Sequence, residues 1–225
     1  MIKEKTPVIF SDFDGTITEH DVIVMIMERF APFEWLEIKN NILYKRTTTL
    51  KDGVEKLFSL IESNKKNEIV DFVKKEIKIR KGFSELLDFC RAENVEFNVV
   101  SGGLDFFIYP VLEKYLARLK IYCNIGDFNS KNIKIDYKHL PVSCNLCGDC
   151  GCCKIEIIEK YPKEKFTRIL IGDSLTDLAP SKVSDIVFAR ADLIKYLEQD
   201  GISNIPFNDF YEVKEQLQEK LLQKI

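Results

Sequence analysis

Four short apolar runs divide the chain, and each of them ends abruptly in small or acidic residues. The runs are PVIFSD (7–12), VEFNVVSGG (95–103), RILIGDS (168–174) and DIVFAR (185–190). Unbroken apolar, β-branched runs of this length are typical of parallel strands that are buried on both faces. Segments between the runs have apolar residues at helical spacing, in 105–116, 153–161 and 176–184. This alternation predicts an α/β fold with a doubly wound parallel sheet.

Residues 20 to 80 interrupt the alternation with helical periodicity alone. Apolar residues recur there three and four positions apart, as Val22, Met25 and Ile26, then Trp35, Ile38 and Ile42, then Val54, Leu57 and Ile61, then Ile69, Val73 and Ile77. This pattern predicts four helices with no strand between them. We therefore expect a helical cap at 19–80, inserted after the first strand, and an α/β core at 1–18 and 81–225.

Two segments of the core depart from the strand–helix alternation. Residues 126–140 alternate between apolar and polar positions, which predicts a hairpin that leads into a cysteine-rich loop. Residues 209–224 have an amphipathic pattern that predicts a final helix on the outside of the core.

Two aspartates follow the first predicted strand, in the order Asp12, Phe13, Asp14, Gly15. Side chains two positions apart on an extended chain share one face, about 6.6 Å apart. Asp12 and Asp14 can therefore face one ligand, and Gly15 permits a sharp turn away from the strand. In doubly wound sheets, ligands bind beyond the carboxyl ends of the strands, where the strand order reverses. This end of the sheet is the predicted functional site.

The other strand ends carry groups that complement these aspartates. Ser101 and Gly102 offer a hydroxyl and a flexible backbone amide ahead of a predicted helix, which suits an anion. Asp173 and Asp177 add two carboxylates. Carboxylates that converge on one point repel each other unless a cation neutralises them, and an all-oxygen site suits Mg²⁺.

The loop CNLCGDCGCCK ends on Lys154 and admits two interpretations. Its five cysteines offer enough thiolates for a structural Zn²⁺ site: Cys144, Cys147, Cys150, Cys152 and Cys153. Four ligands within so few residues make a cramped cage, however. The alternative is a tight reduced loop that places Lys154 at the start of the next helix. In both interpretations the cysteines have a structural role.

Composition and charge exclude several kinds of partner. Apolar residues make up 45% and charged residues 31% of the 225 residues, as in an ordinary soluble globular protein. The net charge of −3 provides no basic field for nucleic acid or an anionic membrane. The chain has no run of about 18 apolar residues and no apolar core of a secretory signal near its start. We therefore expect a cytoplasmic protein with no nucleic-acid or membrane partner, and the sequence indicates no particular oligomeric state.

Taken in order, these positions read SDFDGT (11–16), VVSGG (99–103), the lysine of CCK (152–154) and IGDSLTD (171–177). In this order they resemble the four motifs of the haloacid dehalogenase-like superfamily. The resemblance implies a Rossmann-like core and a Mg²⁺-dependent phosphomonoesterase that acts through an aspartyl-phosphate. Asp12 is the implied nucleophile and Asp14 the implied acid and base. The implied metal ligands are Asp12, the backbone carbonyl of Asp14, and Asp173.

The resemblance also implies which groups bind the phosphoryl oxygens. They are the hydroxyl of Ser101, the amide of Gly102 and the ammonium of Lys154, which face the charge that the transition state spreads over those oxygens. Asp177 is implied to orient Lys154 or a metal-bound water. A small-molecule phosphate ester is therefore the implied partner.

The inserted helices resemble the cap of the phosphoserine phosphatase branch. Within that branch the chain resembles the methionine-salvage phosphatases that act on 2-hydroxy-3-keto-5-methylthiopentenyl-1-phosphate. The resemblance rests on APFEW (31–35), KDGVEKLF (51–58), KIRKGF (78–83), SGGLDFFIYP (101–110), IYCN (121–124), CGCCK (150–154) and SDIVFAR (184–190).

Two features of the cap bear on the substrate. The positions that would clamp an amino acid hold Asp21 and Lys51-Asp52-Gly53 and no arginine, which disfavours phosphoserine. Met25, Phe30, Phe33 and Trp35 either line an apolar pocket or form the core of the cap. The alternatives are phosphoserine phosphatase, another small-metabolite phosphatase or a phosphotransferase of the same branch. A non-catalytic metal-binding regulatory module would be expected to have lost one of the motif residues.

Overall fold

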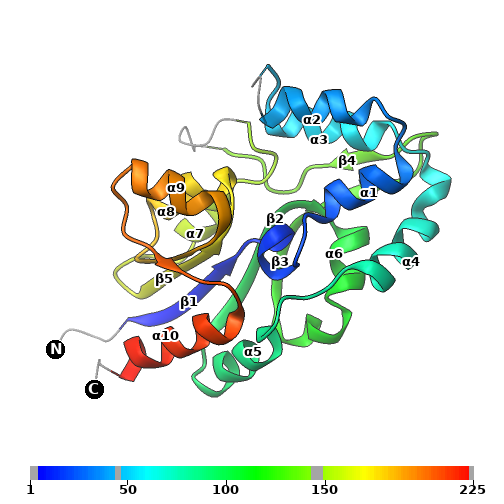
Figure 1. The fold of residues 1–225 in the computed structure, drawn as a ribbon. Coiled ribbons are helices and arrows are strands. Elements are labelled where there is room, and N and C mark those ends of the chain that lie inside the picture. The colour runs from blue at the N-terminus through cyan, green and yellow to red at the C-terminus, as the bar shows by residue number, and fades with distance from the viewer. Residues whose placement is uncertain (1–4, 44–46, 143–148, 223–225) are drawn as a thin grey trace.

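A seven-stranded sheet forms the centre of the molecule (Figure 1). The computed structural model describes residues 5–43, 47–142 and 149–222. The strands are β1 (Thr6–Ser11), β2 (Glu96–Leu104), β3 (Lys120–Asp127), β4 (Lys134–Asp136), β5 (Phe166–Gly172), β6 (Ile186–Ala189) and β7 (Ile205–Pro206). Their order is β4-β3-β2-β1-β5-β6-β7, and all neighbours are parallel except the antiparallel pair β3–β4.

The strand order reverses at β1, which pairs with β2 on one side and β5 on the other. Ser11, the last residue of β1, lies opposite Val99 and Ile171, so these three strands end at the same edge. The four predicted strands correspond to β1, β2, β5 and β6. The predicted hairpin within 126–140 is confirmed in part, because β4 pairs with Ile125–Asp127. The sequence analysis missed the rest of β3, which is only partly buried, and the two-residue β7.

Helices cover both faces of the sheet, as the doubly wound prediction requires. They are α5 (Phe83–Ala92), α6 (Asp105–Val111), α7 (Lys154–Glu159), α8 (Leu178–Ser181), α9 (Ala191–Gln199) and α10 (Phe210–Leu222). On one face Ile9 packs in a core with residues of α5, α6 and α10, and on the other Val8 and Phe10 pack with residues of α7 and α9. Val8, Ile9 and Phe10 are all buried, which explains the unbroken apolar run in β1.

Four helices lie between β1 and α5 in the chain, as predicted for the inserted segment. They are α1 (Val22–Phe30), α2 (Trp35–Leu43), α3 (Leu50–Ser59) and α4 (Lys66–Glu76). In Figure 1 they gather with β4 beyond the carboxyl ends of the central strands. Phe58 of α3 stacks on Phe107 of α6, which anchors the inserted helices to the core. The division into separate core and cap domains stays a prediction.

Two linkers connect the inserted helices to the sheet, and they run side by side. Thr18 bridges Ile79 in antiparallel fashion, and the amide of Arg80 donates to the carbonyl of Ile17 at 2.8 Å. Short helical turns at Phe13–Ile17, Ser63–Lys65, Glu113–Arg118 and Leu175–Asp177 complete the described elements. Within these described ranges, no helix is long and apolar enough to cross a membrane.

Candidate active site

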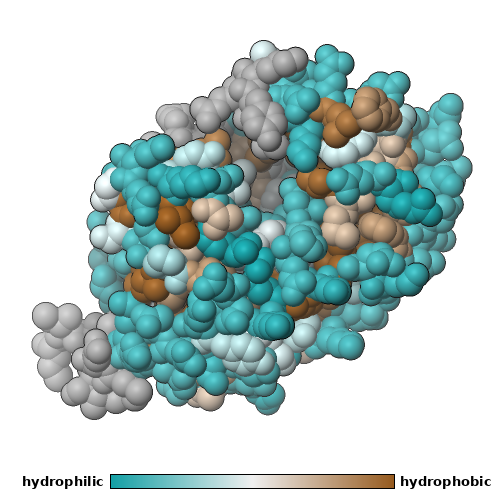
Figure 2. Space-filling model, in the orientation of Figure 1, coloured by the Kyte–Doolittle hydropathy of each residue, from teal (hydrophilic) through white to brown (hydrophobic). Residues whose placement is uncertain are grey.

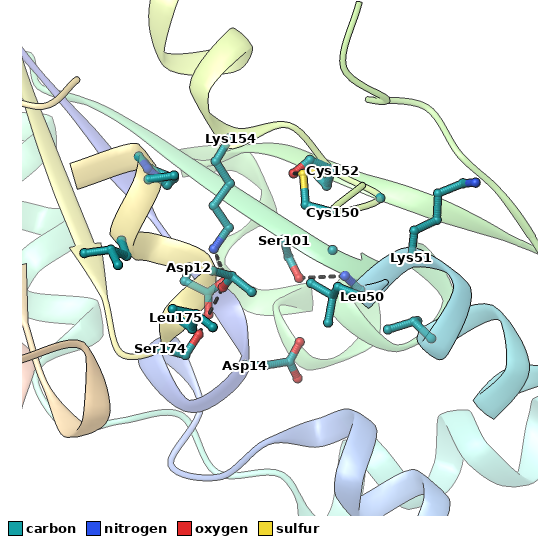
Figure 3. A pocket seen from close by; sticks show the side chains of 18 of the residues that line it. Asp12, Asp14, Leu50, Lys51, Ser101, Cys150, Cys152, Lys154, Ser174 and Leu175 are labelled. Atoms are coloured by element: carbon teal, nitrogen blue, oxygen red, sulfur yellow. Dashed lines mark hydrogen bonds and ion pairs between the residues drawn. The ribbon is translucent and has the colours of Figure 1, made fainter. Parts of the chain in front are cut away.

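A cavity of about 610 Å³ lies where β1, β2 and β5 end beneath the inserted helices. Figure 2 shows the molecule hollowed between these helices and the core. The predicted site residues that line it are Asp12, Asp14, Ser101, Gly102, Lys154 and Asp173, together with Cys150 and Cys152 of the cysteine loop. Figure 3 shows Asp12, Ser101 and Lys154 converging from separate segments of the chain. The structure thus brings together the residues that the sequence analysis placed at the strand ends.

Lys154 is buried between two carboxylates, and Figure 3 shows its contact with one of them, Asp12. It is the first residue of α7, and its Nζ lies 2.6 Å from Asp12 Oδ1 and 2.7 Å from Asp177 Oδ1. Burial acts to lower the pKa of Lys154, but the two carboxylates outweigh it and raise this pKa above its ordinary value. The ammonium is therefore charged and fixed in position, unlike that of a surface lysine.

Asp177 lies behind the cavity wall and is fully buried. Its Oδ2 accepts hydrogen bonds from the amides of Asp173 at 3.1 Å and Ser174 at 3.4 Å, while Oδ1 accepts from Lys154. A Cβ on Gly172 would lie 2.4 Å from the Asp177 carboxyl carbon. Because that approach is too short for any side chain, β5 must end in glycine for this carboxylate to reach Lys154.

Asp173 is held from the loop that follows β1. Its Oδ1 accepts a hydrogen bond of 3.1 Å from the hydroxyl of Thr16. Gly15 has φ of +73°, and a Cβ at this position would lie 2.4 Å from Asp173 Oδ2. Gly15 is therefore required twice, for its left-handed backbone and for the close approach of the carboxylate.

Three carboxylates form a compact acidic group. Asp12, Asp173 and Asp177 each offer an oxygen within 4.8 Å of the others, and they are the only metal-ligand group of this kind among the described residues. Burial, opposed by Lys154, raises the pKa of Asp12 to about 6. Burial and then the charge of Asp12 raise the pKa of Asp173 to about 8. An all-oxygen group with this excess of negative charge fits a hard divalent cation such as Mg²⁺.

Asp14 points into the cavity, away from this acidic group (Figure 3). Its Oδ1 accepts a hydrogen bond of 2.9 Å from the amide of Val22, at the start of α1. Burial, followed by the charges of Asp21 and Asp12, raises the pKa of Asp14 well above its ordinary value. A carboxyl whose pKa is raised in this way holds its proton more tightly than an exposed one and is suited to donate it to a leaving group.

Ser101 and Gly102 lie in the last part of β2, which continues to Leu104, close to the strand end where the sequence analysis placed them. The Ser101 Oγ accepts a hydrogen bond of 2.9 Å from the amide of Gly103. A Cβ on Gly102 would meet nothing closer than the carbonyl of Cys150 at 4.0 Å. The backbone at Gly102 is thus open to the cavity, and an anion can approach it closely.

The four apolar residues that the sequence analysis considered as a pocket lining do not line the cavity. Trp35 is buried in the cap, Phe30 packs edge-on against Phe72 with ring centres 5.5 Å apart, and Phe33 is 81% exposed. Met25 does not line the cavity either. Its aliphatic lining instead comprises Ile23, Leu50, Val54, Leu175, Leu178, Ala179 and Pro180. Leu50 and Val54 are one helical turn apart on α3, so they lie on the same face of this helix. Their spacing alone does not show that this face lines the cavity.

Asp21 and Lys51, from the two cap positions compared with phosphoserine phosphatases, both line the cavity. The Lys51 ammonium lies 3.6 Å from an Asp149 carboxylate oxygen and 5.3 Å from the centre of the Tyr137 ring. The Tyr137 hydroxyl donates to the carbonyl of Lys51 at 3.1 Å. These contacts direct Lys51 toward the cysteine loop and away from the acidic group.

The described part of the cysteine loop gives zinc no support. Cys144 and Cys147 lie outside the described residues. Cys150, Cys152 and Cys153 do not form a metal-ligand group within the described chain. The loop does place Lys154 at the start of α7, as the second interpretation predicts.

The fold is shared with solved phosphoserine phosphatases, one of which has a TM-score of 0.67 and 18% identity over 95% of this chain and 99% of its own. A family model described as "Putative Phosphatase" matches residues 7–216, and the chain belongs to this family.

Three known proteins illustrate the relationship. The 2-hydroxy-3-keto-5-methylthiopentenyl-1-phosphate phosphatase of Bacillus velezensis is 41% identical over 93% of this chain and 89% of its own. The Bacillus cereus protein of the same name is 43% identical over 96% and 98% of the two chains. A solved phosphoserine phosphatase from T. onnurineus has the same fold, with a TM-score of 0.69, 15% identity and 94% of each chain covered.

Proposed function

We propose that this protein is a Mg²⁺-dependent phosphatase that hydrolyses 2-hydroxy-3-keto-5-methylthiopentenyl-1-phosphate. The observation that carries the proposal is the convergence of Asp12, Asp14 and Lys154 with a buried acidic group in one cavity. The relatives of that name, at 41% and 43% identity over nearly the whole chain, support the choice of substrate.

Asp12 and Asp173 are the side chains proposed to hold Mg²⁺, together with the backbone carbonyl of Asp14. The fit rests on the all-oxygen donor set and on carboxylates whose pKa values are raised, first by burial and then by the negative charge of their neighbours. When bound, the ion neutralises these carboxylates and part of the charge of the phosphoryl group.

Asp12 acts as the nucleophile in the proposed reaction. One of its carboxylate oxygens forms a bond to phosphorus while the bond from phosphorus to the ester oxygen breaks. Asp14 gives its proton to the departing oxygen, and the product alcohol leaves. Asp14, now a carboxylate, then takes a proton from a water that attacks phosphorus, so that phosphate is released and Asp12 is restored.

The phosphoryl oxygens are proposed to contact Lys154, Ser101 and the amide of Gly102. Lys154 is charged and fixed before the substrate arrives, so it needs no rearrangement to meet the charge of the transition state. The open backbone at Gly102 leaves room for an oxygen. Asp177 is proposed to act through Lys154, which it holds in position.

The rest of the cavity suits a substrate with an apolar tail. Ile23, Leu50 and Val54 offer an apolar wall for a thioether. Among the described lining residues there is no arginine to hold an amino-acid carboxylate.

Turnover of purified protein with Mg²⁺ tests the proposed substrate. We expect kcat/KM for the methylthio enol phosphate to exceed that for phosphoserine by at least tenfold, about 1.4 kcal/mol at the transition state. A tenfold preference for phosphoserine would contradict the assignment of substrate.

A further inference from the structure

Arg80 lies beneath the loop that carries the two aspartates, and the residue is nine-tenths buried. Nε donates to the carbonyl of Thr16 at 2.8 Å, and Nη2 donates to the carbonyls of Gly15 at 2.8 Å and Thr18 at 2.9 Å. A guanidinium has several N–H groups in a rigid planar fork, so it can hold three carbonyls in one fixed arrangement. Arg80 thereby fixes the backbone immediately after Asp14.

Arg190, which follows β6, joins Arg80 at the same point. Its Nη1 also donates to the carbonyl of Gly15. Its Nε is buried and finds no acceptor among the residues that the structure describes. Burial and then the charge of Arg190 lower the pKa of Arg80 below its ordinary value. Two guanidinium groups at one carbonyl repel each other, which costs free energy. Packing of the core alone would not require two arginines at this point.

Two of the three carbonyls held by Arg80 belong to Gly15 and Thr16, the residues that fix Asp173. Thr16 donates its hydroxyl to Asp173 Oδ1 at 3.1 Å. Gly15 approaches Asp173 so closely that an added Cβ would lie 2.4 Å from Oδ2. Because there is no free space between the loop and this carboxylate, a shift of Gly15 or Thr16 displaces Asp173.

Arg80 also belongs to the linker by which the chain returns from the inserted helices. Its own amide donates to the carbonyl of Ile17, and Thr18 bridges Ile79. One side chain thus bonds to the loop after Asp14 and to the outgoing linker. Arg80 is therefore placed to fix the position of that loop relative to both linkers.

We propose that Arg80, assisted by Arg190, is a positioning residue that holds the loop Asp12–Thr16 so that Asp12 and Asp173 face one Mg²⁺. The proposal rests on the proposed function for the identity of the cation.

Arg80→Lys tests this proposal, because lysine keeps the charge but has a single ammonium that cannot span three carbonyls. Isothermal titration with Mg²⁺ alone, without substrate, measures the Kd directly. We expect the Kd of Arg80→Lys to rise about tenfold or more, as is typical when groups that orient metal ligands are changed. In turnover assays, the half-saturating Mg²⁺ concentration should rise by a similar factor, while KM for the ester at saturating Mg²⁺ stays within about twofold.

Arg168→Lys is the matched control. Arg168 is equally buried and likewise donates to backbone carbonyls, those of Tyr161 and Val183, away from the acidic group. We expect its melting temperature to fall as that of Arg80→Lys does, with the Mg²⁺ Kd unchanged. Equal Mg²⁺ affinities in Arg80→Lys, Arg168→Lys and the unmodified protein would overturn the proposal.

Arg190→Lys decides the question if Arg80→Lys does not fold. Since Arg190 reaches Gly15 with one nitrogen, we expect a smaller rise in the Mg²⁺ Kd, about threefold. An unchanged Kd in this variant would overturn the proposal. Unmodified protein that binds Mg²⁺ but hydrolyses no phosphate ester would contradict the proposed function, while the binding comparison would still decide the role of Arg80.

Discussion

Lys154 shows at the scale of a single residue how this site balances its charges. Its ammonium lies within 2.7 Å of carboxylate oxygens of both Asp12 and Asp177, and all three side chains are buried. One positive charge therefore offsets two negative charges in a region from which water is largely excluded. We infer that Lys154 both binds the substrate phosphate and limits the repulsion between these carboxylates before the substrate arrives.

Lys154→Ala should therefore change both activity and stability. Loss of a charged donor to the phosphoryl oxygens is expected to lower kcat/KM by about 10²–10³. The two carboxylates lose their partner, and breaking a buried pair typically costs about 3–5 kcal/mol of folding free energy. The melting temperature in EDTA should therefore fall as well.

The control for this change is Lys160→Ala, at the end of α7. The Lys160 ammonium lies over the Tyr122 ring, 5.5 Å from its centre, and its side chain is exposed. Both kcat/KM and the melting temperature of Lys160→Ala should stay close to those of the unmodified protein. Normal turnover in Lys154→Ala would show that this lysine does not contact the reacting group.

At the scale of single elements, α3 shapes the part of the cavity that selects the substrate. Leu50 and Val54 face the cavity from α3, next to Lys51. Neither the chemistry of the phosphoryl group nor the acidic group depends on this helix. We therefore expect changes in α3 to alter the choice of substrate and to leave the hydrolysis step intact.

Val54→Ala should weaken selection for the thioether substrate. Removing buried methylene-sized groups from an apolar pocket typically lowers discrimination by about 1–3 kcal/mol, or 10–200-fold. We expect kcat/KM to fall for the methylthio enol phosphate and to change little for a small aryl phosphate. Val70→Ala in α4, which is half-buried away from the cavity, is the control. Equal losses on both substrates would contradict a role in selection.

The element scale also shows which features the sequence could and could not reveal. The strands β1, β2, β5 and β6 were predictable because each is buried on both faces and has an unbroken apolar run. β3 was missed because its burial alternates irregularly. Asp12 and Asp173 were predictable because a short motif follows each strand. The lining residues Leu50 and Val54 were not predictable, since the rotation of α3 depends on packing between distant segments.

At the scale of the whole molecule, folding brings four carboxyl groups from two strand ends into one buried region. Burial and mutual repulsion raise the pKa of Asp173 to about 8 and that of Asp12 to about 6. An acid whose pKa is raised on folding destabilises the folded state once the pH exceeds its unfolded value near 4. Without metal, the free energy of unfolding should therefore decrease as the pH rises from about 4 to about 8.

Mg²⁺ should reverse this loss of stability. At a hundredfold excess over its Kd, a ligand that binds only the folded state adds about 2.7 kcal/mol. For a chain of this size that corresponds to a rise in melting temperature of roughly 5–11 °C. The rise should be larger at pH 8 than at pH 5, because protons compete with the cation for the carboxylates. Asp173→Asn should abolish it, and a rise of equal size in that variant would contradict the metal assignment.

The central claim is that Asp12 accepts the phosphoryl group covalently, and the most direct test is to find that group on the protein. Reaction with excess substrate and Mg²⁺ is quenched in acid, and the modified residue is located by mass spectrometry of the peptides. We predict a phosphoryl group on Asp12, and neither this adduct nor turnover in Asp12→Asn, which keeps the volume of the side chain but removes the nucleophile. A phosphoryl group on another residue, or full turnover in Asp12→Asn, would contradict the account.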